Sequence, residues 1–96
     1  MQRTVIFLAE SFPNPISTFL SEHGFNVMEA LSVSEVLHLT EYHPIDALVI
    51  APPGEWYGLE DIQQKRVTLN LAIHATAAEV LFELSNLLGN GSQQIQ

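Results

Sequence analysis

The pattern of apolar and polar positions predicts strands in four places along the chain. Thr4–Ala9 (TVIFLA) and Asp46–Ala51 (DALVIA) are almost continuous apolar runs, which are typical of strands buried on both faces of a sheet. Phe25–Ala30 (FNVMEA) alternates, so it predicts a half-exposed strand. Val67–Ile73 (VTLNLAI) also alternates. We expect a strand there, with a helix continuing from Leu59 as the alternative.

Helical patterns follow each of these strands. The predicted helices cover about Pro15–His23, Val33–Tyr42, Leu59–Lys65 and Ala77–Leu88. Asn14 is a suitable N-cap for the first helix, and Gly24 and Gly89 are expected to end the first and last helices. Ser32–Glu35 and Thr76–Glu79 have the spacing of capping boxes.

Strands and helices therefore alternate along the whole chain. This order predicts an α/β fold in which parallel strands are joined by right-handed crossovers and helices cover both faces. We expect a sheet of four to five strands in one domain over residues 1–89. Residues 90–96 are expected to form a polar tail or a vestigial fifth strand.

The composition excludes several classes of partner. The chain has 96 residues, of which 47% are apolar and 15% charged, against a usual charged fraction of about 25%. Few charges suggest a surface that a partner covers. Eleven acidic and 3 basic residues give a net charge of -8, which disfavours nucleic acid and anionic membranes. The absence of cysteine excludes disulfides and thiolate metal sites.

The opening MQRTVIFLAES lacks the long apolar core of a signal peptide. No stretch approaches the roughly 20 apolar residues of a membrane span. We therefore expect a soluble, cytoplasmic protein.

Several segments, in the same order, resemble the response-regulator receiver domain. They are FLAES, FLSEHGFNVMEALSVSEVLHL, HPIDALVIAPPG, YGLEDIQ and LAIHATAAEVLFEL, which lie between residues 7 and 84, so the resemblance extends over nearly the whole chain. The resemblance implies a flavodoxin-like, three-layer αβα fold that is truncated at its C-terminus.

The residues that carry receiver chemistry are largely replaced. The resemblance places Ala51 where receivers carry the phosphoryl-accepting aspartate at the end of the third strand. Glu10 matches the first acid of the magnesium-binding pair, but Ser11 stands at the second, and Ala72 replaces the hydroxyl residue. The lysine that ends the fifth strand has no counterpart. The resemblance thus implies no phosphorylation and no metal. The glycines form no nucleotide-binding motif, so we expect no other cofactor.

A second hypothesis places the functional site at the carboxyl ends of the strands. Glu10 and His74 both lie there and could form a pair, although a solvated glutamate and an exposed histidine are the commoner case. A small-molecule sensor or enzyme using a crevice near Glu10, Trp56 and His74 is therefore the alternative function. The other histidines lack the close spacing of a zinc site.

The favoured hypothesis is that the chain is a regulatory, non-enzymatic protein-interaction module. Trp56 and Tyr57 either fold back onto the core or contact a partner, and a third, weaker alternative is a flat aromatic lid over a small ligand. On the last helix Ala78, Phe82 and Leu87 fall outside the apolar stripe, so they are candidate contacts, unless the helix tilts and buries both faces. The fourth strand is expected at an open sheet edge. The partner would be a second copy in a homodimer or another signalling protein, and the chain could be a fragment of a larger one.

Overall fold

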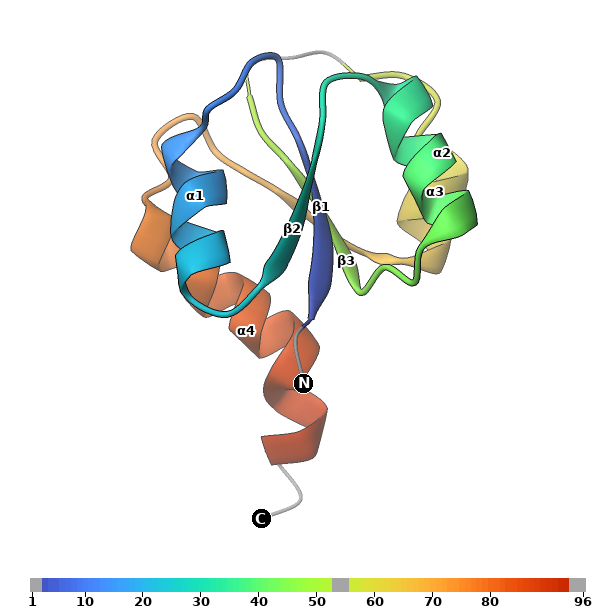
Figure 1. Ribbon diagram of the computed structural model, residues 1–96. Coiled ribbons are helices and arrows are strands. Elements are labelled where there is room, and N and C mark those ends of the chain that lie inside the picture. Colours follow the sequence, from blue (N-terminus) through green and yellow to red (C-terminus); the bar gives the residue numbers. More distant parts are fainter. Residues whose placement is uncertain (1–2, 53–55, 94–96) are drawn as a thin grey trace.

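The computed structural model describes residues 3–52 and 56–93 (Figure 1). Within this part of the chain, the strands are β1 (Thr4–Leu8), β2 (Asn26–Ala30), β3 (Ala47–Ile50) and β4 (Val67–Asn70). They form one parallel sheet in the order β2-β1-β3-β4. The expected α/β fold with a parallel sheet is confirmed. The fourth pattern is a strand, not a helix, but it ends at Asn70 instead of Ile73.

The helices are α1 (Pro15–Glu22), α2 (Val33–Tyr42), α3 (Glu60–Lys65) and α4 (Ala77–Gln93). The Asn14 side chain accepts hydrogen bonds from the first turn of α1, and Gly24, with φ +98°, follows the end of this helix. The Ser32 hydroxyl accepts a bond from the Glu35 N–H at 3.2 Å. The caps expected for these two helices are confirmed.

The last helix is longer than expected. Gly89 does not end it, and the helix includes residues 90–93, so these residues form neither a separate tail nor a strand. A glycine inside a helix costs only about 1 kcal/mol relative to alanine, so it ends a helix only where other contacts favour a turn. Residues 94–96, where the rest of the tail or fifth strand was expected, lie outside the described residues, as do Pro53 and Gly54 at the end of the segment HPIDALVIAPPG.

The direction of each crossover decides which face its helix covers. α1 links β1 to β2 toward one edge of the sheet, whereas α2 and α3 lead toward the other edge. Right-handed connections therefore place α1 on one face and α2 and α3 on the opposite face. After the edge strand β4, the chain returns to the face of α1, where α4 packs beside it (Figure 1). The helices thus form a layer on each side of the sheet.

Each face of the sheet has its own core. Val5 and Phe7 of β1 point to the α1 and α4 side, where Leu20, Val80 and Leu84 pack against them. Ile6 and Leu8 point the other way, and this side includes Val36, Leu48, Leu59 and Ile62. Because β1 and β3 are buried on both faces, they carry the continuous apolar runs seen in the sequence.

Candidate functional site

Ala51 occupies a buried position at the carboxyl end of β3. Its N–H donates to the Leu8 carbonyl at 2.9 Å, which continues the pairing with β1 by one residue. Only 3% of its surface is exposed, and it belongs to the same core cluster as Ala9. A methyl group here can neither accept a phosphoryl group nor bind a cation.

Glu10 and His74 lie at the same end of the sheet but on different strands. Glu10 follows β1 and His74 follows β4, and β3 lies between these strands. Two strand spacings separate their strands, roughly 10 Å. Both side chains are exposed, and no hydrogen bond or ion pair joins them. Across residues 3–52 and 56–93, no group of three or more His, Cys, Asp or Glu side chains could hold a metal ion.

The two neighbouring aromatic residues after β3 have different environments. Trp56 is half-buried and packs against the core that α2 and α3 cover. Tyr57 is 75% exposed. Of the two main outcomes expected for this pair, folding back applies to Trp56 and exposure to Tyr57.

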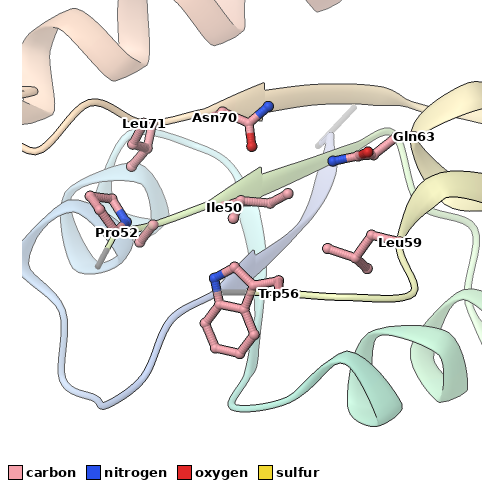
Figure 2. A pocket seen from close by; sticks show the side chains of 8 residues that line it. Ile50, Pro52, Trp56, Leu59, Gln63, Asn70 and Leu71 are labelled. Carbon is pink, nitrogen blue, oxygen red and sulfur yellow. The ribbon is translucent and has the colours of Figure 1, made fainter. Parts of the chain in front are cut away.

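A cavity of about 260 Å³ lies between the carboxyl ends of β3 and β4 and the helix α3 (Figure 2). The Trp56 ring forms one wall and faces Ile50 and Pro52 (Figure 2). Leu59 and Gln63 come from the region of α3, and Asn70 comes from β4. The buried Trp56 Nε1 has no hydrogen-bond partner in the part of the chain that the structure describes.

The edge strand β4 leaves part of its backbone open. The N–H of Leu71 donates to the Ile50 carbonyl at 2.9 Å, so the backbone N–H and C=O of Leu71 point toward β3. In a parallel strand the N–H and C=O of one residue point to the same side, and successive residues alternate. The backbone groups of Val67 and Leu69 therefore also face β3, whereas those of Thr68 and Asn70 face outward. In the described residues, no strand pairs with β4 on that side.

Acidic side chains of α4 lie beside the carboxyl end of β4. A groove of about 350 Å³ runs between the segment after β4 and the first turns of α4. Asn70 and His74 line one side of it, and Glu79 and Glu83 line the other. These two carboxylates are four residues apart, so they share one side of the helix.

The start of α4 is a capping box that fixes one of these acids. The Thr76 N–H donates to the Glu79 carboxylate at 3.0 Å, and the Thr76 hydroxyl donates to it at 3.2 Å. The Glu79 N–H in turn donates to the Thr76 hydroxyl at 3.2 Å. The backbone bond, followed by the hydroxyl bond, lowers the pKa of Glu79 below its ordinary value. Glu79 is therefore held as an anion at the helix N-terminus.

The candidate contacts on α4 do not form one patch. Ala78, Phe82 and Leu87 are all exposed, with 68% of Phe82 and 50% of Leu87 accessible. Phe82 and Leu87 are five positions apart, which places them about 140° apart around the helix. The side of α4 nearest β4 carries Glu79 and Glu83 instead.

Sequence reasoning missed four residues of these sites. Asn70 and Gln63 line the Trp56 cavity, and Glu79 and Glu83 line the groove beside β4. The strand alternation could have placed Asn70 on the face opposite Leu69. The positions of Glu79 and Glu83 depend on the return of α4 to the α1 face, for which the sequence gives no direct signal.

Comparison of the chain with known protein families, curated proteins and solved structures gives no match. Within residues 3–52 and 56–93, none of the helices has both the length and the apolar character that crossing a membrane requires.

Proposed function

We propose that this chain is a receiver-like interaction module that takes no phosphoryl group and binds an extended, basic segment of a partner protein along the open edge of β4. The strand order supports the receiver-like part, because β2-β1-β3-β4 corresponds to the first strands of the flavodoxin-like order 2-1-3-4-5. Ala51 at the end of β3 supports a role without phosphorylation.

The outward-facing backbone of β4 is the observation that carries the proposal. Thr68 and Asn70 each offer one N–H and one C=O at the sheet edge, two residues apart, as the Leu71 to Ile50 bond requires. An added strand pairs with such groups, and the main-chain hydrogen bonds supply affinity in this mode of recognition. Side chains next to the edge then select the sequence that binds.

Charge favours a basic partner over a second copy. Glu79 and Glu83 lie along the groove that continues from the edge strand. The chain has a net charge of -8 and only 3 basic residues, so two copies would repel each other. A segment with lysine or arginine would instead be attracted to this edge, with affinity that falls as salt rises.

Selection from a library of short random peptides tests this proposal. The wild-type chain is the target, and the Thr68→Pro variant serves for counter-selection, because proline removes the outward N–H without touching the pairing with β3. Val27→Pro is the matched control, since the backbone N–H of Val27 also faces outward, on the opposite edge strand β2. We expect enriched peptides that alternate basic and apolar residues and bind wild type and Val27→Pro alike, but not Thr68→Pro.

Two results would overturn the proposal. One is a set of enriched peptides that are neutral or acidic, or that bind Thr68→Pro as well as wild type. The other is a concentration-dependent dimer, seen by light scattering, that Thr68→Pro abolishes, because the edge would then pair with a second copy of the chain.

A further inference from the structure

The cavity at Trp56 contains a buried donor that no described protein group satisfies. An indole N–H can only donate. Leaving such a group buried and unpaired destabilises the fold. The buried Trp56 Nε1 has no partner in the described residues, and the ring lines the cavity (Figure 2). Because this atom has almost no solvent-accessible surface in the free chain, an acceptor in the cavity pairs with it only once the indole ring shifts toward the cavity.

The other residues that line the cavity indicate which further features a ligand needs. Ile50, Leu59 and Leu71 supply apolar surface. Gln63 and Asn70 supply carboxamides, each of which can both donate and accept. Figure 2 shows these two side chains across the cavity from Trp56. Such a lining suits a small, flat molecule whose polar edge carries both a donor and an acceptor.

The charge of the lining residues and the volume of the cavity further restrict the class of ligand. None of the lining residues that the structure describes is charged, and the chain as a whole is strongly acidic. A buried anion would have no cationic partner here and would lose its hydration. The volume of about 260 Å³ lies just below the usual range for sites of drug-sized ligands, roughly 300–1,000 Å³.

We propose that this cavity binds a small, uncharged heteroaromatic amide or nucleobase, with Trp56 Nε1 donating to its acceptor and Gln63 and Asn70 pairing with its amide edge. This site is distinct from the β4 edge: its lining includes Leu59 and Gln63 from the region of α3, and it uses the side chain of Asn70, not its backbone. It also replaces the crevice expected near Glu10 and His74, because neither residue lines this cavity.

The single tryptophan makes the test direct, because its indole N–H gives one resonance in a proton–nitrogen spectrum. The probes are nicotinamide, adenine and uracil, with nicotinate as the charged match for nicotinamide. We expect nicotinamide to shift the indole resonance in a saturable way, and nicotinate to bind at least about tenfold more weakly. Gln63→Ala weakens nicotinamide binding roughly three- to tenfold, whereas the neighbouring Gln64→Ala leaves it unchanged.

Trp56→Phe provides a second measurement that does not depend on the indole signal. It keeps an aromatic wall and removes the donor, and ligand-detected saturation transfer then reports affinity directly. We expect a roughly three- to tenfold loss with a fold intact by circular dichroism. The proposal is overturned if every neutral probe leaves the indole resonance unmoved, which would mean solvent only in the cavity. It is also overturned if nicotinate binds as well as nicotinamide, or if Trp56→Phe and Gln63→Ala leave affinity unchanged.

Discussion

The backbone N–H of Leu71 donates to the Ile50 carbonyl across 2.9 Å, and this contact fixes the orientation of the last strand. It turns the backbone groups of Val67, Leu69 and Leu71 toward β3, so those of Thr68 and Asn70 face the open edge. The exposed polar backbone is thus a consequence of strand register and not of side-chain composition.

Proline at neighbouring positions of β4 distinguishes the two orientations. Leu69→Pro removes a hydrogen bond to β3 and is expected to destabilise the chain by about 1–3 kcal/mol, because the partner carbonyl is left unpaired. Thr68→Pro removes only an outward N–H, so it is expected to cost distinctly less. Urea unfolding followed by circular dichroism measures both. Equal losses for the two variants would show that the register of β4 is different.

Introducing an acid at Ala51 is expected not to make the chain a phosphoryl acceptor. Ala51→Asp places a carboxylate where 3% of the residue is exposed, which is expected to cost about 1–3 kcal/mol. Ala72→Asp, at an exposed position of the same end of the sheet, is the matched control and is expected to have little effect. Incubation with acetyl phosphate and magnesium, followed by mass spectrometry, should give no phosphorylated product from Ala51→Asp. A stable phosphoprotein would contradict this account.

Glu79→Gln tests the capping box through its pH dependence. The pKa of Glu79 is lowered in the folded chain, first by the Thr76 backbone N–H and then by the Thr76 hydroxyl. The ionised carboxylate therefore stabilises the fold at a pH above the pKa that Glu79 has in the unfolded chain. This contribution is lost as the pH falls through the lower pKa that Glu79 has in the folded chain. We expect wild type to be more stable than Glu79→Gln at neutral pH and the difference to shrink in acid.

Urea unfolding across this pH range measures that difference. Glu83→Gln is the control, because it lies on the same side of α4 and no hydrogen bond from Thr76 reaches it. A gap between wild type and Glu79→Gln that stays constant with pH would argue against the carboxylate as the cap.

Phe82→Glu is expected to leave both fold and binding unchanged. Phe82 is 68% exposed and belongs to neither core, so the free energy of unfolding should change by less than about 0.5 kcal/mol. Leu84→Ala, which removes a fully buried side chain two residues later, is expected to cost about 2–5 kcal/mol. Analytical ultracentrifugation and peptide titration complete the comparison. If Phe82→Glu disrupted an assembly or peptide binding, the interface would lie on α4.

The sequence predicts the elements better than their mutual arrangement. Local signals such as the Asn14 and Ser32 caps and the apolar run of β3 act within a few residues, so they locate helices and strands well. The end of α4 is not local in this sense, because Gly89 is compatible with either a helix or a turn. The candidate sites depend on packing between distant elements. Trp56 and Asn70 line the same cavity only because β4 pairs beside β3, and Glu79 reaches the side of β4 only because α4 returns to the α1 face.

Amide hydrogen exchange at Thr68 and Asn70 tests the docking proposal most directly. In the free chain these outward N–H groups are expected to exchange fast, whereas those of Leu69 and Leu71, which face β3, are expected to exchange slowly. Addition of a selected basic peptide should slow exchange at Thr68 and Asn70 specifically, as a new strand pairs with them. Binding that leaves these two amides unprotected and instead protects residues of α4 or β2 would contradict the account.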